Sequence, residues 1–337
     1  MGYRQQIHEI PATLGVTLEK ARAEYGAALR MIRWGDGPVY VCGAGNRAAL
    51  GLAAGSAFES LVGLPVVARP VEFFQTYGLA LLQRRSVLLM IAGPGESPEV
   101  QNLALTAQER GCATIAFSNA PESPLVKLAN HVFLVRAEGD AESPAAAVCM
   151  HAALNFLAFE ARRVLRKPQP GWELVEKDFD RLPERLDWVF TQLPSVVRAV
   201  ASELAHVPRL SIVAAGFSHY PAWQAARRLR SLSSLQVVDV EASEFLHAHT
   251  SFARRGDAVL LLSGSHSKLK KLVHRCAAQA RANGARVLTL TDSNDRDLVD
   301  GSDLGILVPA LQEPPASTLT MFMLEWLAVE ALRAETK

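Results

Sequence analysis

The chain has 337 residues and a mass of 36.5 kDa, about twice the common size of one domain, so two domains are expected. Hydrophobic residues make up 49 % of it, which allows sizeable cores and excludes disorder as the main state. Its 35 basic and 34 acidic side chains give a net charge of +1, which excludes a global attraction to nucleic acid or to an anionic membrane. We therefore expect neither as a partner, although the charge balance allows a local basic site.

The cysteines and the first residues indicate the compartment. Four cysteines are scattered along the chain without a CxxC pair, so no disulfide framework or zinc knuckle is expected. The chain begins MGYRQQIHEI, which lacks an apolar signal segment, and no uninterrupted apolar run approaches the roughly 18 residues of a membrane span. We expect a cytoplasmic protein.

The first half of the chain opens with GPVYVCGAG (37–45), an apolar run that ends in glycines before an Ala-rich helical pattern at 46–60. A V-rich stretch leads to VEFF (71–74), and the apolar run SVLLMIAGPGES (86–97) follows. AQERGCATIAFSN and FLAFEA then complete the half. This order predicts strand, helix, strand, strand, helix, strand, short strand, helix.

The second half repeats this order at an offset of about 170 residues. RLSIVAAGFSHY (209–220) matches the first run and its turn, SEFL (243–246) matches VEFF, and DAVLLLSGSHSK (257–268) matches SVLLMIAGPGES. ARANGARVLTLTDSN (280–294) and WLAVEA (326–331) complete the series. Matches in one order with one offset predict an internal duplication.

The strand-like runs do not alternate apolar with polar residues, which is typical of strands buried on both faces of a parallel sheet. With helices between them, each half is predicted to be an α/β domain, a three-layer αβα structure around a mostly parallel sheet. Pro168, Pro170 and Gly171 predict a linker between the halves, followed by a helix from about Pro183. The expected division is an N-terminal helical segment at 1–30, domain one at 31–166, the linker at 167–190 and domain two at 191–337.

Ligands of open parallel sheets bind where the strands end and the next helices begin. That rule places candidate loops at 43–46 and 92–97 in the first half, and at 216–219 and 263–267 in the second. Neither half contains a GxGxxG or Walker loop, so no cofactor is expected. His247-Ala-His249 has metal-ligand spacing if extended, but no carboxylate or cysteine set accompanies it, so no metal site is expected.

In this order the motifs resemble the tandem sugar isomerase (SIS) domain proteins. The resemblance is to the isomerase portion of glucosamine-6-phosphate synthase and to related phosphosugar isomerases, deaminases and deglycases. It covers nearly the whole chain, through YRQQIHEIPATL, VYVCGAGN, FESLVGLPV and LLMIAGPGES, and SNAPESPLVKLANHVF (118–133) is its most specific match. It implies the SIS fold, a sugar phosphate or amino-sugar phosphate as ligand, and a homodimer in which the partner subunit's histidine completes each site.

The resemblance implies a phosphate site built from hydroxyls at helix N-termini, where backbone N–H groups and the helix dipole favour an anion. The first half has lost most of those hydroxyls. Ala44 and Gly45 stand where the family has Thr and Ser, and the family's Ser-x-Ser-Gly-x-Thr loop has become AGPGES (92–97). The binding candidates of this half are Gly43, Gly45, Asn46, Gly95, Glu96 and Ser97.

The second half keeps its hydroxyls. Its first loop has a serine, its second loop reads SGSHS, and ALQEPPASTLTMF (310–322) resembles the segment that closes the family's site. One hypothesis is therefore that the second half binds the anion, the alternative being that these residues are helix caps and turn residues. The candidates are Ser218, Ser263, Ser265, Ser267, Ser317 and Thr318.

Catalysis of isomerisation needs a carboxylate base near the carbon acid. By resemblance, the family's Lys and Glu fall near Leu229 and Leu232, so both are replaced here, whereas its histidine maps onto His247. Glu59 occupies the matching helix of the first half and is the speculative replacement base, although intact members also carry this Glu. The catalytic candidates are therefore His247 and Glu59.

Two functions follow from this pattern. The first is a phosphosugar enzyme: an aldose–ketose isomerase, or a deaminase or deglycase of an aminated sugar phosphate. The second is a catalytically impaired SIS protein that binds a sugar phosphate or related metabolite without turnover. The replaced Lys and Glu favour the second function, and the absence of a helix-turn-helix reader segment favours the first.

Overall fold

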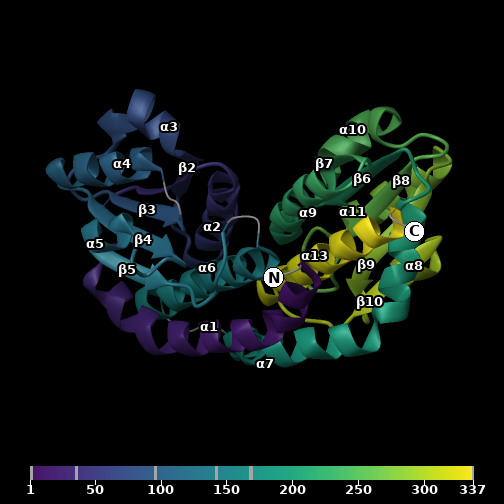
Figure 1. The fold of residues 1–337 in the computed structure, drawn as a ribbon, viewed down its shortest axis with the longest axis horizontal. Coiled ribbons are helices and arrows are strands. Elements are labelled where there is room, and N and C mark those ends of the chain that lie inside the picture. Colours follow the sequence, from purple (N-terminus) through teal and green to yellow (C-terminus); the bar gives the residue numbers. More distant parts are fainter. Residues whose placement is uncertain (1–2, 35–36, 95–96, 141–142, 167–169, 336–337) are drawn as a thin grey trace. The chain divides into compact units, whose positions relative to one another are not determined.

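The computed structural model describes residues 3–34, 37–94, 97–140, 143–166 and 170–335, and the chain divides into two compact units. The N-terminal unit is Glu9–Glu173, and the C-terminal unit is Met1–His8 with Leu174–Lys337. Each unit holds one five-stranded parallel sheet with helices on both faces (Figure 1). The predicted pair of αβα domains is confirmed.

In the N-terminal unit the strand order is β2-β1-β3-β4-β5, and every neighbouring pair is parallel. Every residue of β1 and β3 is buried, as the continuous apolar runs predict. We call the edge at which the strands end the C-terminal edge, and the edge at which they begin the N-terminal edge. The strands are β1 (Val39–Gly43), β2 (Val66–Pro70), β3 (Val87–Ala92), β4 (Ala113–Ser118) and β5 (His131–Leu134).

Two groups of helices cover this sheet. On one face α3, α4 and α5 pack against side chains such as Leu88 and Met90. On the other face lie α1, α2 and α6, and Tyr25 of α1 packs edge-on against Phe133 of β5. Ser143 caps α6 by accepting the Ala146 N–H, with proline at the first helical position. The helices are α1 (Tyr3–Met31), α2 (Asn46–Val62), α3 (Val71–Phe73), η1 (Phe74–Gly78), η2 (Leu79–Leu81), α4 (Pro98–Glu109), α5 (Pro124–Leu128) and α6 (Pro144–Leu165).

The C-terminal unit repeats the order as β7-β6-β8-β9-β10, again all parallel. In each unit the first strand along the chain is an interior strand. On one side it pairs with the second strand, which forms the edge of the sheet, and on the other side it pairs with the third strand. The predicted duplication therefore extends to sheet topology. The strands are β6 (Arg209–Ala214), β7 (Gln236–Glu241), β8 (Ala258–Leu262), β9 (Arg286–Asp292) and β10 (Leu304–Val308).

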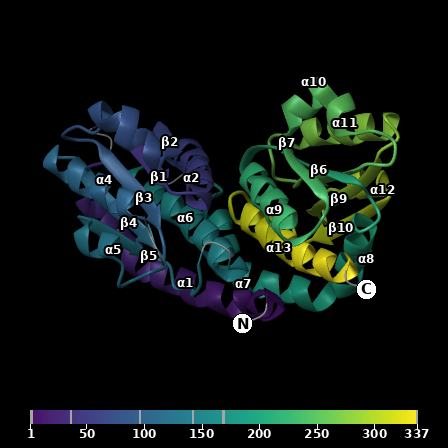
Figure 2. The same cartoon turned by 45° about the horizontal axis from the view of Figure 1, so that its top comes forward.

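Helices α10, α11 and α12 cover one face of the second sheet, while α8 and α9 pack with α13 on the other (Figure 2). Between α9 and α13 a buried ion pair joins Arg228 to Glu325 at 2.8 Å, and Gln224 Nε2 also donates to Glu325. The helices are α7 (Trp172–Gln192), α8 (Pro194–Leu204), η3 (Gly216–Ser218), α9 (His219–Leu232), α10 (Ala242–Phe252), α11 (Lys270–Ala282), α12 (Arg296–Asp300) and α13 (Pro315–Glu335).

The structure differs from the sequence expectation in its connections. VEFF begins in α3 and SEFL lies in α10, because the chain must cross over the sheet to join two parallel strands. His247-Ala-His249 is therefore helical rather than extended, with a kink at Ala248. Helix α7 begins at Trp172 rather than near Pro183, because its buried residues recur at helical spacing through the charged stretch. Those residues are Phe179, Leu182, Leu186 and Val189.

Among the described residues, one helix is long and apolar enough to cross a membrane by length and composition, namely Pro144–Leu165. In its most apolar window, 94 % of the residues are buried inside the protein. This is the pattern of a core helix: α6 packs along α2 in the N-terminal unit.

Candidate functional site

The C-terminal edge of the N-terminal unit collects the loops predicted for the first half. Strands β1 and β3 are neighbours and end at Gly43 and Ala92, so the loops that follow them start side by side. Gly45 precedes α2 with φ 56°, a conformation that favours glycine, and Asn46 opens the helix. Ser97 precedes α4, whereas Gly95 and Glu96 lie outside the described residues.

Arg47, in the first turn of α2, brings a guanidinium group to this edge. A Cβ added at Gly93 would lie 2.1 Å from Arg47 Nη2, so the guanidinium lies directly against the Gly93 backbone. A Cβ at Gly43 would lie 2.7 Å from the Arg47 carbonyl carbon, so the end of β1 also depends on glycine to let α2 begin so close. These two glycines position Arg47 at the ends of β1 and β3.

Asn119, which follows β4, faces the same point. Its Nδ2 donates to the carbonyl oxygens of Ala137 at 2.9 Å and Gly139 at 2.8 Å, which fixes the orientation of the amide. Its Oδ1 then faces Gly93, 2.6 Å from the added Cβ. In the part of the chain that the structure describes, this Oδ1 is buried without a hydrogen-bond partner, on a residue that is 7 % exposed. The edge therefore presents a guanidinium donor and an amide acceptor close together.

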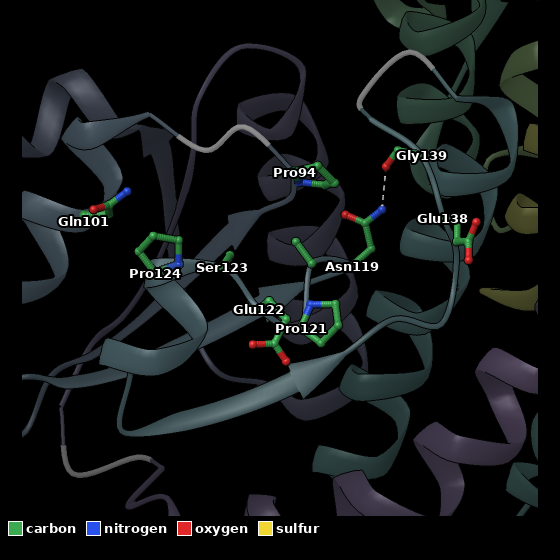
Figure 3. A pocket seen from close by; sticks show the side chains of 10 residues that line it. Pro94, Gln101, Asn119, Pro121, Glu122, Ser123, Pro124, Glu138 and Gly139 are labelled. Atoms are coloured by element: carbon green, nitrogen blue, oxygen red, sulfur yellow. Dashed lines mark hydrogen bonds between the residues drawn. The ribbon is translucent and has the colours of Figure 1, made fainter.

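A cavity of about 420 Å³ opens beside these groups at the ends of β3 and β4 (Figure 3). Asn119 points into it between Pro94 and the 138–139 segment. Its wall includes the exposed carboxylates Glu122 and Glu138, and Glu122 also pairs with Lys127 at 3.3 Å. Acceptors of this kind can receive hydrogen bonds from sugar hydroxyls or from an amine.

Sequence reasoning missed both Arg47 and Asn119. Arg47 directly follows the loop at 43–46, and Asn119 directly follows a buried strand. In a parallel sheet, residues that follow the ends of strands lie at the same edge. The positions of Arg47 and Asn119 after predicted strands could therefore have identified them as site residues.

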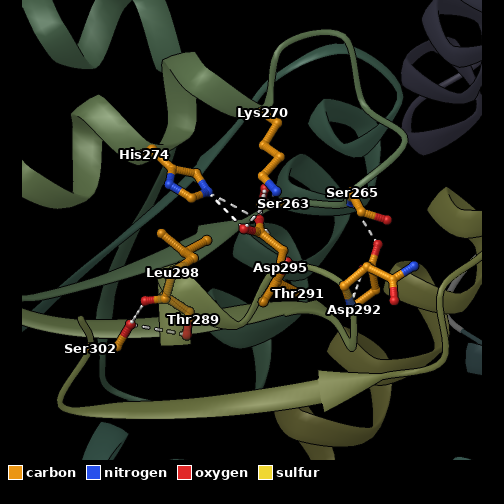
Figure 4. Close-up of polar contacts among 11 residues, drawn as sticks. Ser263, Ser265, Lys270, His274, Thr289, Thr291, Asp292, Asp295, Leu298 and Ser302 are labelled. Atoms are coloured by element: carbon orange, nitrogen blue, oxygen red, sulfur yellow. Dashed lines mark hydrogen bonds and ion pairs between the residues drawn. The ribbon is translucent and has the colours of Figure 1, made fainter. Parts of the chain in front are cut away.

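The C-terminal edge of the C-terminal unit has a different chemistry (Figure 4). Ser263 Oγ donates to Asp295 Oδ2 at 3.0 Å, and the Ser265 N–H donates to Asp292 Oδ2 at 2.6 Å. Two of the three serines of the predicted anion loop therefore contact carboxylates. Neither aspartate was expected from the sequence, although Asp292 is the last residue of β9 and Asp295 lies in the turn that follows it.

Asp295 is the centre of this network. Lys270 Nζ lies 3.0 Å from its Oδ1 and His274 Nε2 lies 2.9 Å from the same oxygen, while Thr291 Oγ1 donates to Oδ2. Burial raises the pKa of Asp295, but the hydrogen bonds from Lys270, His274 and Ser263 outweigh that effect and hold it below its ordinary value. An internal carboxylate thus occupies a cradle of cationic and hydroxyl donors.

The remaining predicted hydroxyls of the second half are dispersed. Ser218 ends η3 before α9, and Ser267 Oγ accepts the Leu269 N–H in a turn. Ser317 and Thr318 lie buried in the first turn of α13, and Ser317 Oγ donates to the Pro314 carbonyl. The structure thus brings Ser263 and Ser265 together and gives Ser267 and Ser317 local turn contacts.

The catalytic candidates lie on two helices. His247 is exposed on α10, which follows β7 at the C-terminal edge of its sheet. Glu59 lies near the end of α2, where its Oε1 accepts the Val66 N–H at 3.2 Å at the start of β2. Glu59 is therefore at the N-terminal edge of its sheet, away from Arg47. Leu229, at the family's lysine position, is 2 % exposed in the core of the C-terminal unit.

Among the described residues, no group of three or more His, Cys, Asp and Glu side chains is arranged to hold a metal ion.

Comparison with known proteins agrees with this architecture. The family model of the SIS domain matches residues 35–161 and again 203–330. The glutamine–fructose-6-phosphate aminotransferase (isomerizing) of Streptococcus pneumoniae is 26 % identical over 263 residues, which are 76 % of this chain and 42 % of that protein. The chain thus spans less than half the length of the curated relatives it matches.

Two solved structures share the fold across nearly the whole chain. The C-terminal domain of glucosamine-fructose-6-phosphate aminotransferase from Francisella tularensis superposes with a TM-score of 0.87 at 13 % identity, covering 99 % of this chain and 96 % of that one. Tagatose-6-phosphate ketose/aldose isomerase from Escherichia coli gives 0.78 at 15 % identity, covering 98 % and 92 %. With two SIS segments, two duplicated sheets and these relatives, the chain belongs to the SIS domain family.

Proposed function

We propose that the chain binds a sugar phosphate at the C-terminal edge of the N-terminal unit, with Arg47 as the partner of the phosphate. The observation that carries this proposal is the guanidinium held against Gly93, at the edge where the family resemblance places the anion. Arg47 supplies a charge where Ala44 and Gly45 have replaced hydroxyl side chains. Gly43, Gly45, Asn46 and Ser97 contribute helix N-termini to the same edge.

Asn119 and the adjoining cavity suit the sugar end of such a ligand. The Asn119 amide is held in one orientation, and burial of its Oδ1 without a hydrogen-bond donor costs free energy. A sugar hydroxyl would supply that donor. The carboxylates of Glu122 and Glu138 favour hydroxyl or amine groups over a second anion.

The C-terminal unit is the competing location for the anion, through Ser263, Ser265 and the other hydroxyls of the second half. The contacts of Asp292 and Asp295 weigh against it, because a phosphate there would meet two carboxylates already bound to those serines. The site at the C-terminal edge of the N-terminal unit is therefore the proposed one, and the experiment below separates the two.

The proposed activity is that of the phosphosugar isomerases and deaminases that the family resemblance implies, with a carbohydrate derivative as substrate. His247 is the first residue to test, since Glu59 lies at the opposite edge of the sheet from Arg47 and can act only on a substrate bound elsewhere. We also propose the homodimer that the family resemblance implies. A second candidate, binding without turnover, is favoured by Leu229, which is buried in the core where the family's lysine would stand.

The binding proposal is tested by calorimetric titration with fructose 6-phosphate and with fructose. Gly93→Ala should weaken fructose 6-phosphate binding about tenfold or more, because its Cβ would displace the guanidinium, and Arg47→Gln should do the same. Gly264→Ala is the matched control at the equivalent position of the second half, where the nearest atom to an added Cβ lies 3.6 Å away. Equal binding of both sugars, or weakening by Ser263→Ala with no effect of Gly93→Ala, would overturn the proposal.

Turnover is tested separately, by proton NMR of fructose 6-phosphate and glucosamine 6-phosphate in D₂O with the wild-type protein. Loss of the C1 or C2 proton signal that is abolished by His247→Ala or Glu59→Gln identifies an enzyme of this class. Binding without any exchange identifies the second candidate. Light scattering tests the dimer, and a monomer would count against a role for His247 in a shared site.

A further inference from the structure

The N-terminal edge of the first sheet, opposite the proposed sugar site, contains a second cavity of about 460 Å³. It lies where α1 ends and where β3, β4 and β5 begin, and its volume is within the range of about 300–1,000 Å³ typical of small-molecule sites. Its lining is Met31, Ile32, Arg33, Arg84, Arg85, Ser86, Val87, Gly111, Ala113 and His131.

This lining is strongly basic. Among the residues that the structure describes, it contains three arginines and a histidine but no aspartate or glutamate. Arg33, Arg84 and Arg85 are exposed, and within the described ranges none of their guanidinium groups takes part in a hydrogen bond or ion pair. Three guanidinium groups around one cavity repel one another unless an anion is present between them.

The backbone at this cavity is strained. Arg85 has φ 84° and is the only non-glycine residue with positive φ among those described. An L-residue with a long side chain rarely adopts this conformation, and such outliers persist where the side chain has a function at that point.

The second half of the chain provides an internal comparison for this turn. Ala113 N donates to the Ser86 carbonyl just as Arg286 N donates to the Asp257 carbonyl, and both distances are close to 3 Å, at 3.0 and 2.8 Å. Gly256 therefore occupies the position of Arg85, with φ 91°, so the turn that needs glycine has glycine in the second half and arginine in the first.

The charged side chains at this turn also differ between the two halves of the chain. Ser86 stands where the second half has Asp257, whose carboxylate binds Arg209 at 2.6 Å. Arg286 at that edge likewise pairs with Glu203 at 2.8 Å. His131 corresponds in register to Leu304. At this turn the first half thus has arginine in place of glycine and serine in place of the carboxylate.

Helix dipoles do not explain why the arginines at this edge differ between the two halves in having carboxylate partners. Helices α1 and α4 end at the N-terminal edge of the first sheet, and their partial negative charges favour nearby cations. Helices α8 and α11 end at the same edge of the second sheet, yet the arginines there have carboxylate partners as well.

We propose that this cavity, which we call the arginine pocket, is a binding site for a small molecule carrying two or more phosphate groups. Arg33, Arg84 and Arg85 are the anion-binding residues, and the strained backbone of Arg85 places its guanidinium at the pocket. Planar guanidinium groups bind phosphate oxygens in pairs, and separate phosphates can contact separate arginines. The site is distinct from the sugar site, because the two lie at opposite edges of the sheet.

The test is calorimetric titration of the full-length protein with pyrophosphate at a constant ionic strength of about 0.1 M, so that screening is the same in every titration. Saturable binding of one pyrophosphate per chain is expected, and Arg85→Gly and Arg84→Ser should each weaken it about tenfold. Arg85→Gly keeps the turn, because glycine already stands at the equivalent position, and a melting temperature no lower than that of wild type verifies that the variant is folded.

Arg255→Ser is the matched control, since Arg255 is exposed at the position of the second half that corresponds to Arg84. The pyrophosphate affinity of the Arg255→Ser variant should stay within about twofold of wild type, because the ionic strength, and with it the screening of charges, is the same in both titrations. Absence of saturable binding, or equal weakening by Arg255→Ser, would overturn the proposal. So would loss of binding by Arg47→Gln but not by Arg85→Gly, which would place pyrophosphate at the sugar site. Tighter binding of a short DNA duplex, abolished by Arg85→Gly, would replace the small molecule by nucleic acid.

Discussion

The Ser263 hydroxyl donates to the Asp295 carboxylate across 3.0 Å, at the edge of the second sheet where the sequence predicts an anion. At the equivalent glycines of the two halves, a Cβ added at Gly264 would lie nearest the Asp292 carboxylate, whereas one added at Gly93 would lie nearest the Arg47 guanidinium. The two halves of the duplication thus present opposite charges at equivalent places. This contrast explains why the serines of the second half, which are the more conspicuous feature in the sequence, are not the residues proposed to hold the ligand.

Replacing Asp295→Asn should destabilise the C-terminal unit by about 1–3 kcal/mol, because it leaves Lys270 and His274 without their anionic partner. The measurement is urea unfolding at pH 7. Asp297→Asn, at an exposed residue of helix α12, which begins directly after Asp295, is the control and should change the unfolding free energy by less than about 0.5 kcal/mol. Equal effects of the two substitutions would contradict the role of Asp295 as the stabilising partner of Lys270 and His274.

The same carboxylate predicts an acid sensitivity. Since the pKa of Asp295 is lowered by its donors, its contribution to stability is complete above the ordinary aspartate pKa of about 3.9 and is lost as the pH falls below it. Unfolding curves between pH 5 and pH 2 should therefore converge for wild type and Asp295→Asn. Parallel curves would show that the carboxylate is not stabilised in the folded state.

His151 predicts a second pH dependence at higher pH. Burial lowers the pKa of His151 to about 3, so between about pH 6.5 and pH 3 the unfolded chain binds a proton that the folded chain does not. Stability should fall with decreasing pH in that window, by about 2 kcal/mol at pH 5 relative to pH 7. His151→Leu should flatten the dependence, whereas His206→Gln, at an exposed histidine, should retain it.

The buried pair of Arg228 and Glu325 should be the most sensitive polar contact of the C-terminal unit. Both side chains are 1 % exposed, so Glu325→Ala leaves a buried guanidinium without its carboxylate and should cost about 3–5 kcal/mol. Glu330→Ala, on the same helix, should cost about 1 kcal/mol or less, because its partner Arg333 is 45 % exposed. Thermal or urea unfolding measures both, and a cost below about 1 kcal/mol for Glu325→Ala would show that the pair does not hold α9 to α13.

Relief of the backbone strain at Arg85 predicts a gain in stability rather than a loss. Arg85→Gly should raise the unfolding free energy of the N-terminal unit by up to about 1 kcal/mol, because glycine adopts a φ of 84° without steric cost. Gly256→Ala at the equivalent turn should lower stability by about 1–2 kcal/mol, since it introduces that cost. A loss of stability in Arg85→Gly would mean that the arginine side chain stabilises the fold itself.

Much of the fold was predictable because the strands that form its core are continuous apolar runs. Residues 87–91 and 259–262 predicted buried parallel strands, and the shared order of motifs predicted two similar sheets. The short helices α5 and α12 were not predicted, because five residues are too few to show a helical period. Helix α7 was placed too late in the sequence, because its prolines and charges concealed the spacing of its buried residues.

The candidate site was less predictable, because its partners are distant in sequence. Arg47 meets Gly93 and Asn119, and Ser263 meets Asp295, only after the parallel strands have brought their ends together. The hydroxyl-rich loop at 263–267 indicated anion binding by composition alone. Composition does not reveal that the Asp295 carboxylate, just after the next strand, accepts a hydrogen bond from the Ser263 hydroxyl of that loop.

Helix α1 has a consequence for the order in which the chain acquires its structure during synthesis. Its first residues belong to the C-terminal unit, where the Arg228 guanidinium lies 5.6 Å from the centre of the Tyr3 ring and His8 packs edge-on against Phe190. These residues are synthesised before the rest of the N-terminal unit but find their partners only after that whole unit has been made. Until then the first turns of α1 lack the surface against which they pack, and a chaperone could bind them in that interval.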